Sequence, residues 1–151
     1  MLDALTNSNL LATPKGRLCS SVTQLNWRAS NVEKMIIIAG TIDLQDPAKR
    51  DETLEIARNL QQKTRDEEPG CLAYVFSADP CVAGRLVVHE LWRDEASLAA
   101  HFKHANYLNM RDALGRVGLK GADNKKYRVD LAEPVYDSTF TPRADFFTEG
   151  K

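Results

Sequence analysis

The side chains best suited to chemistry lie in the second half of the chain. His101 falls on the apolar stripe of a helical pattern that also holds Leu98 and Phe102. An imidazole titrates near neutral pH, and partial burial keeps it neutral and able to accept a proton. The pattern therefore makes His101 a candidate general base. The alternative is a core histidine bonded to a carbonyl or a carboxylate.

Glu90 and Trp92 share one face of a predicted strand, because side chains two residues apart point the same way. A carboxylate on a helix-covered face is costly unless it is paired. Glu90 either orients His101 or holds a substrate hydroxyl. Otherwise it forms a salt bridge to Arg85, to Arg93 or to a basic residue of a partner subunit.

Two aromatic residues could complete a ligand site. Trp92 could stack on an aromatic substrate or simply fill the core. Tyr74, on a neighbouring predicted strand, could donate a hydrogen bond to a phenolate oxygen or act as a core residue with its hydroxyl at the rim.

Other motifs carry less chemistry. His101, His104 and Glu90 have the residue types of a zinc site, but histidine pairs on metal-binding helices usually stand four residues apart and no third firm ligand is visible. We expect no metal. His104 lies about 60° further round the helix and is expected at the surface. Residues 115–121 lack the residue order of a phosphate-binding loop.

The elements that must position these residues follow a β-α-β-β-α-β order. Hydrophobic period and turn residues predict strands at 35–44, 71–76, 85–92 and 127–131, helices at 47–67 and 95–114, and a basic loop at 120–126. This order predicts a ferredoxin-like α+β subunit, in which one antiparallel sheet carries both helices on a single face. The second helix is expected to bury a continuous stripe of Leu98, His101, Phe102, Ala105 and Leu108.

The uncovered face of this sheet predicts self-association. Val87 and Leu91 point away from the helices, and strand 71–76 is apolar on both sides. An isolated subunit would expose a larger apolar patch than monomers usually tolerate. We expect a homodimer that packs sheet against sheet.

Length and composition fit one folded domain. The chain has 151 residues, of which 43% are hydrophobic and 27% charged. Residues 1–34, rich in Ser, Thr and Asn, are expected to be a mobile extension, residues 35–137 the domain, and residues 138–151 a tail. Because the ordered pattern begins at Met35, we hypothesise that Met35 is an alternative start.

Charge and cysteine usage restrict partners and location. A net charge of −1 gives no field for nucleic acid or an anionic membrane. The longest apolar run, residues 35–39, is far shorter than the roughly 20 residues that a membrane span needs. With three cysteines, no CxxC motif and no apolar leader, the chain is expected in the cytoplasm, with Cys71 and Cys81 as free thiols rather than a disulfide.

Two segments of the sequence resemble the antibiotic biosynthesis monooxygenase family. Residues 69–74 fit the family run P-G-C-x-x-Y, and residues 90–101 fit E-x-W-x-x-x-x-x-L-x-x-H. The likeness spans about residues 35–135 and implies a dimeric α+β barrel. This family includes quinol and anthrone-type oxygenases, an isomerase of a phosphorylated signalling sugar, haem-degrading enzymes and members without known activity.

The sequence departs from two branches of that family. Asn106 occupies the place where members often carry a second histidine. Residues 39–41 offer no asparagine on the first strand, and His101 stands where haem-degrading members have a tryptophan. The resemblance therefore supports neither a two-histidine mechanism nor haem degradation.

What the resemblance implies is oxygenation without metal, flavin or other cofactor. Such a reaction needs a small quinol-like or polyphenolic aromatic that can be deprotonated and then give an electron to O2. His101 would be the base and Glu90 its catalytic partner, with Trp92 and Tyr74 against the substrate. The alternatives are an isomerase of a small hydroxy-ketone and a non-catalytic ligand-binding or regulatory dimer.

Overall fold

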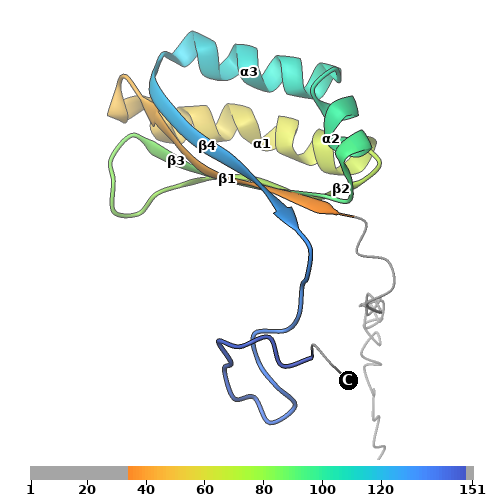
Figure 1. Cartoon of the computed structure of the whole chain (residues 1–151). Coiled ribbons are helices and arrows are strands. Elements are labelled where there is room, and N and C mark those ends of the chain that lie inside the picture. The colour runs from red at the N-terminus through yellow and green to blue at the C-terminus, as the bar shows by residue number, and fades with distance from the viewer. Residues whose placement is uncertain (1–33, 149–151) are drawn as a thin grey trace, which may run out of the picture.

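The computed structural model describes residues 34–148 and confirms the ferredoxin-like α+β fold (Figure 1). One antiparallel sheet has the order β2-β3-β1-β4. Its helices lie together on one face (Figure 1). The elements are β1 (Met35–Leu44), η1 (Pro47–Lys49), α1 (Arg50–Glu67), β2 (Cys71–Ala78), β3 (Arg85–Trp92), α2 (Glu95–His101), α3 (Ala105–Val117) and β4 (Leu119–Val129). The predicted extension at residues 1–34 lies, apart from residue 34, outside the described residues.

Strand β3 forms the centre of the core. Period-two alternation predicts that Leu86, Val88, Glu90 and Trp92 share the helix-covered face, and all four are buried. They pack with apolar residues from the neighbouring strands and from all three α-helices. The predicted strand 85–92 and its buried face are therefore confirmed, and two candidate site residues lie inside the core.

The predicted helix at 47–67 is present as the 3-10 turn η1 followed by α1, and it stops where the sequence predicts. The Asp46 side chain accepts a hydrogen bond from Ala48 N at 3.0 Å, and Pro47 opens a single 3-10 turn before the α-helix. At the other end Glu68 has extended backbone angles, and Pro69 cannot continue the helix. Gly70 then takes a φ of 93° and turns the chain into β2.

The outer edge of β2 is covered by side chains of α1. Arg65 donates from Nε and Nη2 to the Tyr74 carbonyl oxygen at 2.9 and 2.6 Å. Gln61 Oε1 accepts the Phe76 backbone N–H at 2.9 Å. These bonds satisfy backbone groups that face away from β3, and they fix the place of Tyr74 in the sheet.

The single second helix predicted at 95–114 is wrong. The chain forms α2 and α3, separated at residues 102–104, so the predicted stripe ends at His101. Phe102, Ala105 and Leu108 are exposed. At 100° per residue, Met110 would lie about 180° from His101 on a continuous helix. The break lets both residues face the core, where both are buried.

The predicted basic loop at 120–126 is also wrong, because β4 begins at Leu119. The strand pairs with β1 along almost its whole length, for example Ile38 with Lys126 and Ile37 with Tyr127. Its residues from 119 to 128 are exposed. Backbone pairing with β1 outweighs the weak strand preference of Lys, Asp, Asn and Gly on an edge strand.

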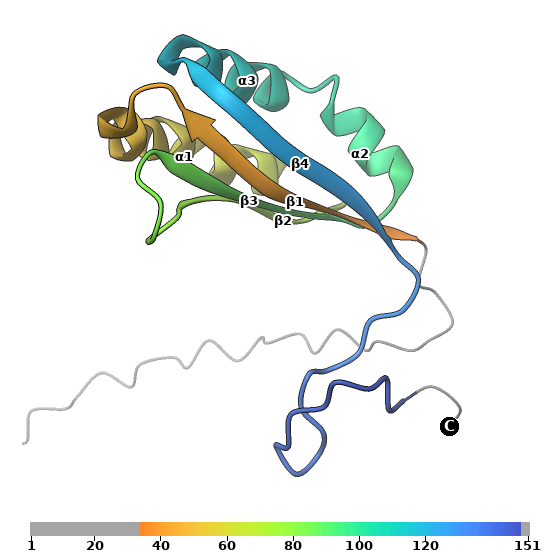
Figure 2. The same ribbon diagram turned by 60° about the vertical axis from the view of Figure 1, so that its left-hand side comes forward.

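After β4 the chain continues as an extended segment of residues 130–148. Figures 1 and 2 show that it leaves the sheet on the side opposite to the helices.

Cys71 and Cys81 are free thiols. Among residues 34–148 no helix is long and apolar enough to cross a membrane.

Strands β1 and β4 approach each other closely at Gly40, which generates the first prediction. A Cβ at this position would overlap the Asp123 carbonyl oxygen and lie 2.6 Å from Asn124 Cα, whereas a Cβ at Gly121 would have no neighbour within 4 Å. We expect Gly40→Ala to lower the free energy of unfolding by about 1–3 kcal/mol. Gly121→Ala should change it by less than about 0.5 kcal/mol. Denaturant unfolding of both variants tests this, and equal effects would contradict it.

Candidate functional site

A buried hydrogen bond between His101 and Glu68 forms the centre of the site. His101 Nδ1 lies 2.7 Å from Glu68 Oε2, and only 1% and 5% of the two side chains are exposed. Because an ionised carboxylate can only accept, Nδ1 carries the proton and Nε2 presents its lone pair. Nε2 is buried and has no hydrogen-bond partner within residues 34–148. The imidazole is thus held in one tautomer as a proton acceptor.

Two helix ends position this pair. His101 is the last residue of α2, which starts where Asp94 Oδ1 accepts the Ser97 N–H at 2.7 Å. That cap confirms the predicted helix start, and hydrogen bonds from Ser97 lower the pKa of Asp94 to about 2. Glu68 follows the last turn of α1. A Cβ on Gly70 would overlap the Ser97 side chain, so only glycine lets the turn after α1 approach the first turn of α2 this closely.

Aromatic rings surround the imidazole. Its centroid lies 4.4 Å from that of Trp92 and 5.3 Å from that of Tyr74. The structure therefore brings three of the four predicted site residues together. Tyr107 at 5.1 Å and Phe102 at 5.8 Å complete the ring contacts. Tyr107 was not among the predicted site residues, because the break after α2 changes the face on which it lies.

Glu90, the fourth predicted residue, does not bond to His101. Its Oε2 accepts the Trp92 Nε1–H at 2.9 Å. Burial raises the pKa of Glu90 to about 7; the Trp92 bond opposes this shift and the charge of Glu68 adds to it. The two arginines considered as its partners bind other carboxylates, Arg85 with Asp43 at 2.7 Å and Arg93 with Asp94 at 3.0 Å.

Glu68 is the functional residue that sequence analysis missed. It ends the acidic run Asp66-Glu67-Glu68, which has the composition of a solvated helix end. Two signals could have identified it: it directly precedes the Pro69-Gly70 turn, and a buried histidine needs an acceptor. The expected orienting carboxylate exists, but α1 supplies it rather than β3.

His104 lies partly at the surface, as predicted, but its ring also has two contacts within the subunit. Its Nδ1 accepts the Asn106 N–H at 3.2 Å and caps α3. Nδ1 also lies 3.2 Å from Glu68 Oε1, with 38% of the side chain exposed. Because the cap occupies the Nδ1 lone pair, a neutral His104 has no proton there to donate. The contact becomes an ion pair only when His104 is protonated.

Asn106, at the place of the family's second histidine, is buried and has a structural contact. Its amide donates to Glu67 Oε2 at 3.1 Å and so joins α3 to α1. A side-chain amide does not accept a proton at neutral pH, so Asn106 cannot act as a second histidine would. Burial lowers the pKa of His101, and the hydrogen bond and charge of Glu68 act in the opposite direction.

A surface hollow and the search for metal ligands add no residue to the site. A surface hollow of about 470 Å³ is lined by Arg111, Asp112, Gly115 and Arg116 of α3 and contains none of the predicted residues. In the described part of the chain no group of three His, Cys, Asp or Glu side chains is placed to hold a metal ion.

Comparison with known families identifies the architecture. The model of the antibiotic biosynthesis monooxygenase family matches residues 35–113, just over half of the 151 residues. This chain belongs to the antibiotic biosynthesis monooxygenase family. The match runs from β1 through most of α3 and contains all the residues of the site described above.

Solved structures support the same fold. One is a candidate antibiotic biosynthesis monooxygenase from Caulobacter crescentus CB15, with 26% identity, coverage of 68% of this chain and 93% of that chain, and a TM-score of 0.57. Another candidate monooxygenase, from Deinococcus radiodurans, has 22% identity, coverage of 68% and 99%, and a TM-score of 0.60. A Pseudomonas aeruginosa protein has 24% identity, coverage of 68% and 99%, and a TM-score of 0.56. A search of curated proteins gives no significant match.

The His101–Glu68 bond predicts how His101 titrates. Glu68→Gln removes the negative charge that favours the imidazolium form, so the pKa of His101 should fall further, by at least about one unit. NMR titration of the imidazole C–H signals measures this change. As a control, Glu55→Gln, which alters an exposed carboxylate elsewhere on α1, should leave the His101 midpoint unchanged. An unchanged His101 midpoint in Glu68→Gln would show that Glu68 does not govern the imidazole.

Glu90 predicts a pH-dependent stability. Its ordinary pKa of 4.5 rises to about 7 in the folded chain, so the folded state holds a proton that the unfolded state releases. The contribution of Glu90 to stability therefore falls as pH rises through this window. Glu90→Gln keeps an acceptor for Trp92 and should remove this loss. Relative to the parent, its free energy of unfolding should gain up to about 3 kcal/mol between about pH 4.5 and 8.

Denaturant unfolding across that pH range measures the difference between the two proteins. The opposite titration of His101 occurs in both and cancels. Glu55→Gln, which alters an exposed carboxylate on α1, should show a flat difference from the parent. A flat difference for Glu90→Gln as well would contradict the raised pKa.

Proposed function

We propose that the chain is a cofactor-independent monooxygenase that oxidises a quinol-like or polyphenolic aromatic with O2, using His101 as the base. The observation that carries this proposal is the unpartnered Nε2 of His101, buried among aromatic rings while Nδ1 is held by Glu68. A buried polar atom without a partner is costly unless it serves a ligand. A lone pair in this place suits the hydroxyl proton of a phenol. Family membership supports the same chemistry.

The proposed reaction begins with proton transfer from a phenolic or enolic hydroxyl of the substrate to Nε2. The resulting imidazolium is stabilised by the Glu68 carboxylate, which accepts its Nδ1–H. The electron-rich anion then reduces O2. With a quinol, one oxygen atom is inserted at a ring C–H carbon and the other leaves as water while the ring is oxidised to a hydroxyquinone, so the substrate supplies all four electrons and no external reductant is needed.

The other predicted residues have supporting roles in this proposal. Trp92 and Tyr74 would contact the aromatic ring, and Tyr74 can donate from its hydroxyl because burial keeps its pKa above the ordinary value. Glu90, with a pKa near 7, can hold a proton beside the substrate. Since Nε2 is buried, the substrate reaches it only when a neighbouring side chain moves. Phe102 is the most exposed of the rings around the imidazole.

The proposal includes a homodimer located in the cytoplasm. In the single subunit the sheet face opposite the helices is open, and Val87 and Leu91 on that face are partly exposed. Stacking two such faces would bury both apolar surfaces. The stability of this dimer also affects the site, because Trp92 and Glu90 lie on the opposite face of β3, the strand that carries Val87 and Leu91.

Oxygen uptake tests the proposed reaction. With a panel of hydroquinones and anthrones, the parent should consume O2 after chelation and removal of flavin. His101→Gln should lower kcat/KM at least tenfold, since a positioned base contributes about 10²–10⁴-fold. Glu55→Gln, a change of an exposed side chain on α1 away from both the site and the open face, should retain activity.

The unfolding free energy of each variant separates loss of function from loss of fold. If the protein converts a hydroxy-ketone without O2, it is an isomerase that uses the same base and not an oxygenase. If His101→Gln is folded and keeps its full oxygenase rate, His101 is not the base. If no substrate or ligand is found and His101→Gln only lowers stability, the cluster is structural.

A further inference from the structure

The segment after β4 carries large apolar side chains that the described chain leaves uncovered. We call residues 130–148 the C-terminal arm. Phe140 is 86% exposed, Val135 63%, Phe146 59% and Tyr136 55%. Four such residues in a short segment exceed what scattered surface hydrophobics explain, and they mark a contact surface.

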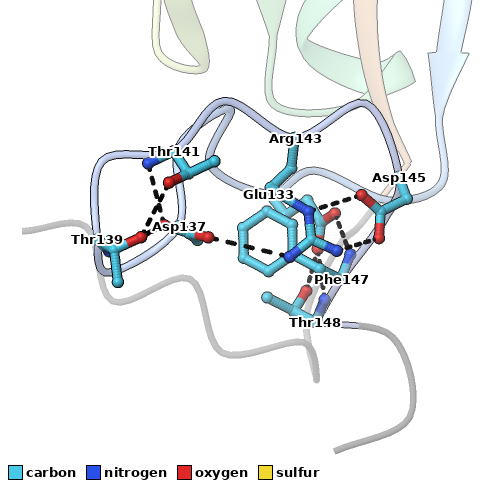
Figure 3. Close-up of polar contacts among 8 residues, drawn as sticks. All are labelled: Glu133, Asp137, Thr139, Thr141, Arg143, Asp145, Phe147 and Thr148. Carbon is cyan, nitrogen blue, oxygen red and sulfur yellow. Dashed lines mark hydrogen bonds and ion pairs between the residues drawn. The ribbon is translucent and has the colours of Figure 1, made fainter.

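The arm nevertheless has a defined conformation, which polar contacts maintain (Figure 3). Asp137 Oδ1 accepts the backbone N–H groups of Thr139 and Thr141 at 2.8 and 3.1 Å. Glu133 accepts those of Phe147 and Thr148 at 2.7 and 2.9 Å. The arm is therefore preorganised, which lowers the entropic cost of binding.

The tip of the arm displays Phe140 in an unusual way. Phe140 has a φ of 60°, in the left-handed region that residues other than glycine rarely adopt. Its N–H donates to the Asp137 carbonyl oxygen at 3.0 Å, and Tyr136 pairs with Pro142 across the turn. Arg143 N–H also donates to the Val135 carbonyl oxygen at 2.8 Å. The backbone bonds thus hold a strained turn that leaves an aromatic ring in solvent, as expected of a residue with a binding role.

The position of the arm indicates what it contacts. Figures 1 and 2 show it on the side of the sheet that the helices do not cover. It begins directly after Val129, which pairs with Met35 at the start of β1. The arm therefore borders the space in front of the open sheet face.

The apolar part of the open face lies next to the start of the arm. Ile37 pairs with Leu91 on one side and with Tyr127 on the other, so the three side chains form a row across β3, β1 and β4. Tyr127 is 50% exposed and the other two are partly exposed. Leu91 also pairs with Ala73 of β2. A molecule that covers this row would also meet the arm.

We propose that the arm docks on a second copy of this chain, with Tyr136 and Phe140 as its anchors. This inference rests on the homodimer of the proposed function and adds how its subunits interlock. A copy stacked on the open face occupies the space that the arm borders. By two-fold symmetry each subunit then receives the arm of the other, and both uncovered surfaces of the chain are buried in one isologous interface. Aromatic anchors of this kind commonly dominate binding energy.

Analytical ultracentrifugation of the full chain tests the proposal. The parent should form a dimer, and Tyr136→Ser combined with Phe140→Ser should raise the dimer Kd at least about 100-fold, because four anchors are lost per dimer. Ile56→Ser removes an equally apolar, exposed side chain from α1 and should leave the Kd unchanged. Equal unfolding curves for the monomeric subunits would confirm that the double variant folds.

The possible outcomes separate the arm from the dimer. A parent that stays monomeric would overturn both the homodimer and the docking of the arm. A double variant with the parent's Kd would overturn the docking and leave the homodimer standing. As a second measurement, a photo-crosslinking phenylalanine analogue at position 140 should join labelled to unlabelled chains in a mixed dimer. Crosslinks confined to single chains would also overturn the docking.

Discussion

The structure depends on one buried contact between a carboxylate and an imidazole that are far apart in the chain. Neither Glu68 nor His101 could be buried alone at acceptable cost, because an unpaired buried charge or polar ring loses its hydration without compensation. The contact between Glu68 and His101 requires α1 to stop at residue 67 and α2 to stop at residue 101. It also requires a tight turn between α1 and β2, so that the chain after α1 can lie close to α2. The turn at Pro69-Gly70, the cap at Asp94 and the break before α3 all serve this geometry.

The same contact explains the chemical asymmetry of the site. Glu68 is hydrogen-bonded to Nδ1 of His101, whereas Glu90 accepts its hydrogen bond from the Trp92 indole N–H. Two carboxylates thus stand in similar burial with different partners, and the charge of Glu68 adds to the raised pKa of Glu90. Family membership sets the frame for these residues but does not specify the substrate, since one fold supports several chemistries.

Much of the fold could be predicted from sequence because strands with one buried face alternate in hydrophobicity. Strand 85–92 and the caps at Asp46 and Asp94 are cases in which local pattern and tertiary environment agree. The helix break at residues 102–104 could not be predicted in this way, since both halves carry helical periodicity and only the phase between them differs. Over residues 119–126 strand β4 has no buried face and so carries no alternating signal. The partner of His101 was missed because pairing between α1 and α2 is a long-range property that spacing within one element does not contain.

The covering of the β2 edge by Arg65 and Gln61 has a consequence for assembly. Two outward-facing backbone groups of that strand are already bonded within the subunit, whereas β4, at the opposite edge, has no neighbour beyond it among the described residues. Continuous fibril growth through strand addition needs two free edges per molecule, one to receive and one to offer. Because the β2 edge is shielded, edge-to-edge strand pairing between copies could occur only through β4 and would stop at two molecules. The chain is thereby protected from open-ended polymerisation without the need for an inward-pointing charge or a proline on that strand.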